Sequence, residues 1–136
     1  MGDRLTKDDF EELSNFRYQL RRFIGWSEQL TKRMGASNLQ YLLMLHIRGY
    51  AGRQWATIGE LAERLQAKHH GVVALVSRCE KLGFVERRPG RSDRREVEVH
   101  LTAKGNRLVE RLAELHRDEL ARLQGIFTVP AGMDKE

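Results

Sequence analysis

The hydrophobic period changes once along the chain, and this change constrains the fold most. Residues 57–82 place apolar side chains at the three- and four-residue steps of α-helices. From Phe84 the pattern is that of β structure, and Glu96–Leu101 strictly alternates polar and apolar residues. The turn-forming cluster Pro89–Asp93 separates the two β-like runs. We therefore expect helices followed by a β-hairpin.

The helical part contains two short helices joined by a tight turn. Thr57 and Glu60 have the spacing of a capping box, which opens a helix ending near Leu65. Only residues 66–68 separate it from a second helix over His69–Leu82, which Gly83 ends. Such a pair followed directly by a hairpin predicts a helix-turn-helix with a wing.

Longer helices are expected on both sides of this unit. The first spans about Asp8–Arg33, with Thr6 as its N-cap, and the last spans about Ala103–Ile126. Between them, the capping box Ser37–Gln40 opens a helix whose inward residues are predicted to include Leu39. The first and last helices exceed what one small core can cover, so part of their apolar surface should meet another chain.

Positive charge is concentrated in one quarter of the chain. Residues 64–95 hold nine Lys and Arg against three Asp and Glu, whereas the other 104 residues hold 15 basic and 16 acidic side chains. A localised basic stripe beside near-neutral flanks is typical of a surface that binds a polyanion. The alternative is a solvated face, although acidic side chains serve solubility better.

Length and composition exclude several classes of protein. The 136 residues suit about one domain. The apolar runs are only a handful of residues long, so no membrane span is expected, and the N-terminus lacks the apolar core of a secretory signal. The one cysteine, Cys79, excludes an internal disulfide, so we expect a reducing, cytoplasmic location.

The helix over His69–Leu82 has two distinct faces. At 100° per residue, Val72, Leu75, Val76, Cys79 and Leu82 lie on the core side. The other face is predicted to enter the major groove of double-stranded DNA, with modest base specificity, because it lacks a long Arg, Asn or Gln at its centre. The predicted DNA contacts here are Lys68, His69, His70, Gly71, Val73, Ala74, Ser77, Arg78 and Lys81.

The hairpin tip carries arginines that suit the minor groove. Arg91 and Arg95 are the leading candidates, because arginine responds to a narrow groove and its negative potential. Asp93, in the same turn, could orient one of them. The predicted phosphate contacts are Arg87, Arg88 and Arg94.

Catalytic and metal-binding patterns are absent from the sequence. There is no Gly-rich phosphate loop, HExxH motif or nucleophile elbow, so neither an enzyme nor a cofactor is expected. His69 and His70 have no cysteine or helically spaced carboxylate to complete a metal site. We expect His46, His100 and His116 to be partly buried structural residues. Cys79 is expected to act as a small apolar residue and not as a redox sensor.

The segment GFVERRPGRSDRREVEVHLTAKG, residues 83–105, resembles the wing of MarR-type transcriptional regulators. The resemblance extends over about residues 8–126. It implies an obligate homodimer in which residues 8–34 and 103–127 form dimerisation helices and residues 37–101 form a winged helix-turn-helix DNA-binding lobe. It also implies that Arg95 is the minor-groove arginine, with Asp93 as its partner.

The sequence departs from the family at two places. Family members often have Asp and a Ser/Thr pair at the start of the recognition helix, where this chain has Lys68, His70 and Gly71. Most members also finish with a further apolar helix, where we expect residues 128–136 to be a loose tail. The C-terminal part of the dimer interface is therefore expected to be short or differently built.

The resemblance also raises the possibility of an effector site. Family members often bind small aromatic or phenolic anions between the dimerisation helices and the DNA-binding lobe. The alternative is that the same aromatic residues are ordinary core. The candidate ligand-binding residues are Phe16, Arg17, Arg22, Phe23, Trp26, Tyr50 and Trp55.

These features together predict a mainly α fold with a small β-hairpin wing, as one MarR-like domain over residues 1–136. The predicted function is that of a homodimeric repressor that binds a pseudo-palindromic operator and that a small aromatic ligand could release. The alternative is a protein-interaction adaptor that keeps the fold without recognising a DNA sequence.

Overall fold

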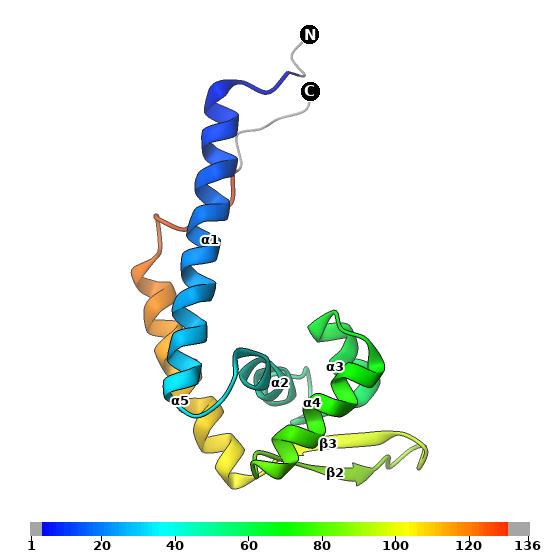
Figure 1. Cartoon of the computed structure of the whole chain (residues 1–136). Coiled ribbons are helices and arrows are strands. Elements are labelled where there is room, and N and C mark those ends of the chain that lie inside the picture. The colour runs from blue at the N-terminus through cyan, green and yellow to red at the C-terminus, as the bar shows by residue number, and fades with distance from the viewer. Residues whose placement is uncertain (1–3, 131–136) are drawn as a thin grey trace.

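The computed structural model describes residues 4–130 and confirms a mainly helical fold with a small β wing (Figure 1). The elements are α1 (Lys7–Arg33), α2 (Asn38–Arg48), β1 (Trp55–Thr57), α3 (Ile58–Leu65), α4 (His69–Lys81), β2 (Val85–Pro89), β3 (Val97–Leu101) and α5 (Ala103–Arg122). The predicted loose tail lies mostly outside the described residues, because these end at residue 130.

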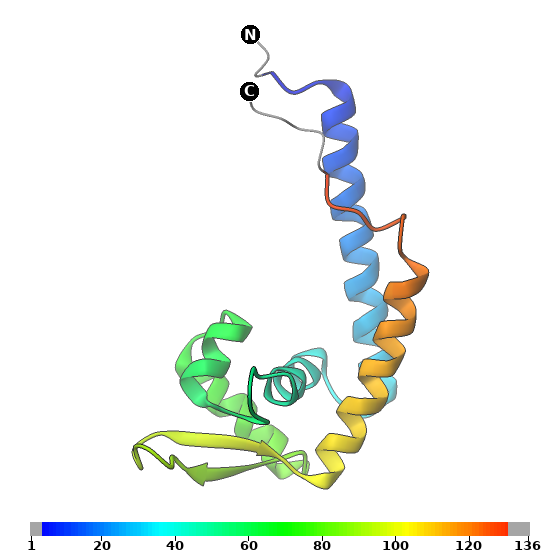
Figure 2. The same cartoon turned by 180° about the vertical axis from the view of Figure 1, so that it is seen from behind.

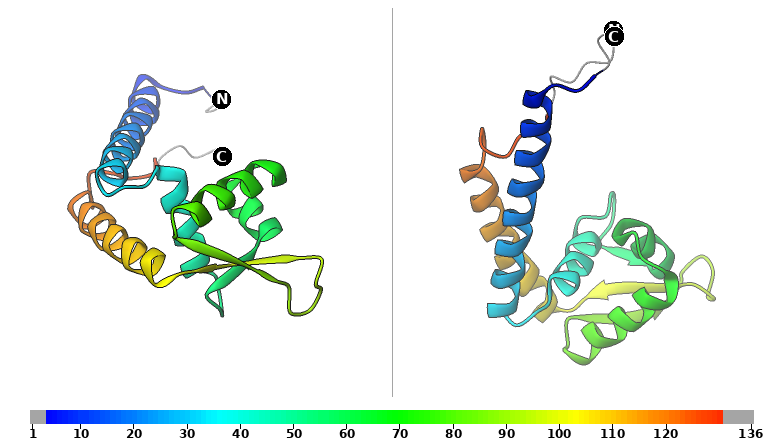
Figure 3. Two further views of the ribbon diagram at one scale, coloured as in Figure 1. Left: turned by 60° about the horizontal axis from the view of Figure 1, so that its bottom comes forward. Right: turned by 45° about the horizontal axis from the view of Figure 1, so that its top comes forward.

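The long helices and the lobe occupy different parts of the molecule. α5 runs antiparallel to α1 and lies beside its C-terminal half, so the N-terminal turns of α1 extend beyond it (Figures 1 and 2). The helices α2, α3 and α4 and the sheet form a lobe at the other end of α1. The hairpin β2–β3 projects from this lobe, away from α1 and α5 (Figure 3).

Local capping explains where three helices begin. Ser37 and Gln40 form the predicted capping box at α2, with backbone-to-side-chain distances of 2.9 and 3.1 Å. Thr57 and Glu60 form the one predicted at α3. Thr6 caps α1, as expected, and Asp9 completes a capping box there. Each box satisfies backbone N–H groups that the first helical turn leaves free.

The turn between α3 and α4 uses backbone conformations that few residues adopt. Gln66 ends α3 with φ +51°, in the left-handed region, and Lys68 precedes α4 in an extended conformation. Gly83 follows α4 with φ +82°, where a side chain would be strained. The predicted three-residue turn and helix stop are therefore confirmed.

The core of the lobe is centred on α2. Leu43, Met44 and Ile47 are completely buried, and Leu61, Val72, Val76 and Val99 close around them from the neighbouring elements. The prediction that Leu39 faces the core is wrong, because this residue lies in the first turn of α2 beside an open hollow and is 55% exposed. The prediction that Leu82 faces the core is also wrong, because this residue follows the last turn of α4 and is 42% exposed.

The sheet contains a strand that the sequence analysis did not predict. Its order is β1–β3–β2, and both pairings are antiparallel. β1 has only three residues, and Trp55 lies opposite His100 of β3. As a result β3 is the central strand with a partner at each edge, and Glu98, Val99 and His100 are all buried.

A buried polar cluster connects the long helices to the lobe. The imidazole of His116 on α5 lies 2.7 Å from the Ser27 hydroxyl of α1 through Nε2, and Nδ1 donates to the Leu112 carbonyl at 2.7 Å. The Ser27 hydroxyl donates to Asn38 of α2 at 2.9 Å, and Tyr41 stacks on the imidazole at 4.6 Å between ring centres. His116 is therefore structural, as predicted.

The last helix ends earlier than predicted. α5 finishes at Arg122, four residues before the expected end at Ile126, and residues 123–127 form turns with Gly125 at φ +83°. The turns bring Phe127 back onto α1, where its ring centre lies 5.6 Å from that of Phe16. The helical pattern of α5 does not extend into these residues because Gly125 adopts a left-handed conformation, which commonly ends a helix.

The junction between the wing and α5 requires a glycine. Thr102 caps α5 through the amide of Gly105 at 3.0 Å, and its own amide donates to the Phe84 carbonyl at 3.0 Å. A β-carbon on Gly105 would lie 2.1 Å from the Phe84 carbonyl oxygen, which is backbone and cannot move aside freely. Gly105 thus allows the start of α5 to pack closely against the residue before β2.

We expect Gly105→Ala to lower the free energy of unfolding by about 1–3 kcal/mol, because overpacking must displace backbone. Gly71→Ala is the matched control: Gly71 lies inside α4 with open space around it, so alanine should raise stability by up to about 1 kcal/mol. Urea unfolding followed by circular dichroism measures both. Equal effects from the two variants would contradict the close packing at Gly105.

Candidate nucleic-acid interface

The outward face of α4 contains most of the predicted helix contacts. His69, His70, Gly71, Val73 and Ala74 are all exposed at the N-terminal end of the helix. Val72, Leu75, Val76 and Cys79 are buried on the opposite face, as the helical periodicity predicts. The remaining candidates Lys68, Arg78 and Lys81 are exposed, and Ser77 is half-buried.

Arg87 is directed toward α4 and not into open solvent. Its guanidinium pairs with Glu80 at 2.5 Å, donates to the Ser77 hydroxyl at 2.8 Å and reaches the Val73 carbonyl at 3.2 Å. These bonds fix β2 against the middle of α4. They also occupy the Ser77 hydroxyl, which was predicted to contact DNA.

The tip of the wing is a short loop closed by backbone bonds. Gly90 donates to the Glu96 carbonyl at 2.8 Å, and Glu96 donates to the Asp93 carbonyl at 3.0 Å. A β-carbon on Gly90 would lie 2.2 Å from the Asp93 carbonyl oxygen, so the loop requires glycine there. These contacts close the loop that presents residues 91–95 at the end of the hairpin.

Arg95 is the most exposed of the paired wing arginines. Its side chain is 92% exposed, and its guanidinium makes two bonds to the Asp93 carboxylate, each 3.1 Å long. This bonding lowers the pKa of Asp93 below its usual range and raises the pKa of Arg95. Asp93 thus orients Arg95 in the way that the sequence analysis predicted, while leaving the side chain open to solvent.

The other arginines of the wing differ in their partners. Arg88 pairs with Glu86 at the edge of the sheet. Arg94 has no ion-pair partner among the residues that the structure describes. Arg91 is 58% exposed but binds the buried carboxylate of Glu98, and its guanidinium lies over the Trp55 ring. Sequence analysis missed Glu98, because the alternation of β3 gives only a polar face and does not show what covers it.

The start of α4 and the wing come together around one hollow. It has a volume of about 320 Å³, and Arg95 and Val97 line it from the wing. His69 and Val73 line it from α4, and Thr57, Ile58 and Gly59 line it from the start of α3. The outward end of α4 and the wing arginine therefore lie on the same side of the lobe.

Comparison with known proteins identifies the lobe. Residues 34–96 match the sequence model of the MarR family. The lobe is therefore similar in sequence to the MarR family, over just under half of the chain. A comparison with curated proteins finds no match.

Solved structures share the fold of this chain. AbsC, a MarR family transcriptional regulator from Streptomyces coelicolor, is 19% identical with a TM-score of 0.79 over 93% of this chain and 85% of that one. A MarR family protein from Bacillus stearothermophilus is 21% identical with a TM-score of 0.75 over 92% and 86%. A point mutant of MepR from Staphylococcus aureus, solved with a bound oligodeoxyribonucleotide, is 18% identical with a TM-score of 0.66 over 92% and 86%. Identities this low show the fold alone.

The predicted effector residues lie in two separate clusters. Phe16, Phe23 and Trp26 pack around His116 and Phe127 between α1 and α5. Tyr50 and Trp55 instead stack with Arg53 beside the wing, with 4.4 and 3.8 Å from its guanidinium to the two ring centres. Arg17 and Arg22 are on α1, and Arg22 lies over Tyr18. The seven residues do not line one cavity.

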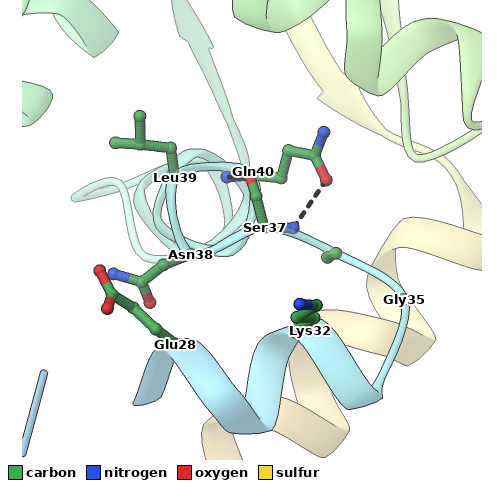
Figure 4. A pocket seen from close by; sticks show the side chains of 8 residues that line it. Glu28, Lys32, Gly35, Ser37, Asn38, Leu39 and Gln40 are labelled. Atoms are coloured by element: carbon green, nitrogen blue, oxygen red, sulfur yellow. Dashed lines mark hydrogen bonds between the residues drawn. The ribbon is translucent and has the colours of Figure 1, made fainter. Parts of the chain in front are cut away.

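An open hollow lies instead where α1 meets α2 (Figure 4). Its volume is about 650 Å³, and Glu28 and Lys32 of α1 line it opposite Asn38, Leu39 and Gln40 of α2. None of the predicted effector residues lines it. Within residues 4–130 no helix is long and apolar enough to span a membrane, and no group of three His, Cys, Asp or Glu could hold a metal ion.

The buried thiol of Cys79 should be unreactive in the folded protein. Burial raises its pKa to about 11, so little thiolate, the reactive form, exists at pH 8. We expect a thiol reagent such as Ellman's to react with the native protein at least about a hundredfold more slowly than with the urea-unfolded chain.

A matched control moves the thiol to the exposed face of α4. Ala74→Cys in a Cys79→Ala background should react at once without denaturant, because Ala74 is exposed. Rapid reaction of native Cys79 would instead show that the buried face of α4 opens in solution.

Proposed function

We propose that this MarR-type protein is a homodimeric, sequence-specific DNA-binding transcriptional repressor. In this proposal α4 enters the major groove of a pseudo-palindromic operator and the wing enters the adjacent minor groove. One observation carries the proposal: His69 and Val73 at the start of α4 and Arg95 of the wing line the same hollow. One protomer can thus present a helix N-terminus and an arginine to neighbouring grooves.

The distribution of charge also supports DNA binding by the surface that the start of α4 and the wing form. The lobe exposes Lys68, His70, Arg94 and Arg95. Of these, Arg95 is paired with an acidic residue, Asp93. A helix N-terminus also favours a phosphate group. The oligodeoxyribonucleotide bound to a structurally similar MepR mutant is consistent with this use of the fold.

Arg95→Ala should weaken binding to the operator more than binding to unrelated DNA. We expect the wild type to prefer its own promoter region over a scrambled duplex by about a thousandfold, with both affinities falling steeply as salt rises. Fluorescence anisotropy over a salt series measures both affinities. Arg111→Ala, on the exposed surface of α5, is the control and should leave them unchanged.

The result also separates the proposal from its alternative. Equal and weak binding of the wild type to both duplexes, or binding that salt does not affect, would favour a protein-interaction adaptor with a MarR-type fold. An unchanged preference in Arg95→Ala would remove the wing arginine from operator recognition.

The homodimer is supported by apolar surface on the long helices. Phe10, Leu13 and Ile24 of α1 and Leu120 of α5 are all exposed. The N-terminal turns of α1, which carry Phe10 and Leu13, extend beyond α5 (Figure 1). Exposed apolar surface of this kind marks a protein interface.

Leu13→Glu should shift the protein from dimer to monomer. In analytical ultracentrifugation we expect the wild type to sediment with twice the chain mass of 15.8 kDa. The variant should sediment as a single chain at the same concentration, because a buried carboxylate lacks a partner in the interface. Glu12→Ala, one residue away and exposed, should stay dimeric. A dimeric Leu13→Glu would place the interface elsewhere.

A further inference from the structure

The carboxylate of Glu98 is the most thoroughly bound acidic group in the wing. Its side chain is only 3% exposed. One oxygen accepts bonds from the Arg91 amide at 2.9 Å and the Arg91 Nε at 3.0 Å. The other lies 3.0 Å from Arg91 Nη2 and 2.9 Å from His100 Nε2. Four bonds satisfy the acceptor capacity of the carboxylate.

These bonds fix both the backbone and the side chain of Arg91. The guanidinium meets the carboxylate through two parallel bonds, which set its direction as well as its distance. The hydrogen bond from the backbone amide of Arg91 holds the first residue of the tip loop, directly after Gly90. Arg91 is therefore held at the base of the loop that presents Arg94 and Arg95.

Trp55 connects this pair to the helix-turn-helix. The guanidinium of Arg91 lies 4.3 Å from the centre of the Trp55 ring, and that of Arg53 lies 3.8 Å from it. Arg53 also donates to the Trp55 carbonyl at 3.0 Å and pairs with Glu60, the capping residue of α3. A continuous series of contacts thus runs from the wing tip to the start of α3.

The other wing arginines have no comparable anchor. Glu86, the partner of Arg88, and Asp93, the partner of Arg95, are both far more exposed than Glu98. Asp93 also belongs to the tip loop itself, so its bond to Arg95 cannot fix the loop relative to the lobe. Only the pair of Glu98 and Arg91 joins the described tip residues to a buried part of the sheet.

We propose that Glu98 is the positioning residue of the wing, holding Arg91 inward so that the tip loop presents Arg94 and Arg95 to DNA. This inference rests on the proposed function and gives Arg91 a different role from the minor-groove contact predicted from the sequence. Arg91 shapes the surface that DNA meets and does not itself bind a phosphate or a base.

The carboxyl group of Glu98 is ionised at any pH at which DNA binding is measured. Hydrogen bonds from Arg91 lower the pKa of this carboxyl to about 2, with a smaller contribution from His100. The carboxylate therefore keeps its four bonds in neutral solution. A two-stranded hairpin is only marginally stable by itself, so a charged anchor near its tip should decide how well the loop is ordered.

Three variants separate positioning from direct contact. Arg91→Lys keeps the positive charge but cannot make two parallel bonds. Glu98→Leu removes the anchor and fills the space, and the freed Arg91 can turn to water because its side chain is already 58% exposed. Glu86→Leu is the matched control, since it removes an exposed carboxylate from the same sheet and changes the net charge equally.

The first measurement uses the wing without DNA. We expect hydrogen exchange of the amides of residues 91–96 to be about tenfold or more faster in Arg91→Lys and Glu98→Leu than in the wild type and Glu86→Leu. Circular dichroism and thermal unfolding show whether each variant is folded. Unchanged exchange in both folded variants overturns the proposal. If Glu98→Leu does not fold, Arg91→Lys decides the result.

The second measurement is operator affinity over a salt series. We expect Arg91→Lys and Arg91→Ala to lose about tenfold or more in affinity with an unchanged salt slope, whereas Arg94→Ala lowers the slope by about one. A wild-type affinity for Arg91→Lys together with a lower slope for Arg91→Ala would show a direct phosphate contact and overturn the proposal. If the wild type binds no DNA, the proposed function fails, while the exchange measurement still tests the role of Glu98.

Discussion

The burial of α2 is the constraint on which the lobe depends. The other four helices, β1 and β3 all contact this helix. Leu43, Met44 and Ile47 are removed from solvent completely, which contributes on the order of 5–9 kcal/mol at about 1.5–3 kcal/mol for each side chain. This sum is comparable with the whole stability of a small domain, about 5–15 kcal/mol. The positions of α4 and the wing therefore depend on one short helix that carries no predicted functional residue.

The net charge of the chain overstates the charge available to a polyanion. The basic stripe predicted from the sequence is real, but Arg87 is bound to α4 and Arg91 to Glu98. Arg88 and Arg91 remain 54% and 58% exposed although both are paired. Among the described residues, Arg94 and Arg95 are the wing arginines that no residue outside the tip loop binds. The bound arginines hold the wing in place, so the same residue type serves both structure and recognition within nine residues.

Most of the fold could be predicted because its signals are local. Capping boxes at Ser37 and Thr57, the stop at Gly83 and the alternation in residues 96–101 each depend on residues close in sequence. β1 was missed because three residues give too short a pattern, and it forms only by pairing with β3, more than forty residues later. The burial of Glu98 was missed because Arg91 binds it only once the hairpin has formed, and Trp55, whose ring lies under Arg91, comes from more than forty residues earlier.

The sequence predicted which residues belong to the candidate site better than it predicted which side chains bind one another. Arg95 and Asp93 were matched correctly because both lie in one turn, where spacing alone places them together. Arg91 was predicted as a minor-groove contact without its partner, because an isolated sequence shows an arginine but not the carboxylate that binds it. A buried acid on the polar face of a strand therefore indicates a basic partner in the adjoining loop, here seven residues away.

Polar clusters fix α2 to its neighbours near both ends. Near its start, Asn38 and Tyr41 meet Ser27 of α1 and His116 of α5. Just beyond its end, Tyr50 stacks with Arg53, which pairs with Glu60 of α3 and lies over Trp55. Because a helix transmits displacement along its axis, the long helices and the wing are connected through α2. In the proposed dimer, the separation of the two lobes would then follow from how the long helices of the two chains pack, and this separation must match the distance of about 34 Å between successive major grooves.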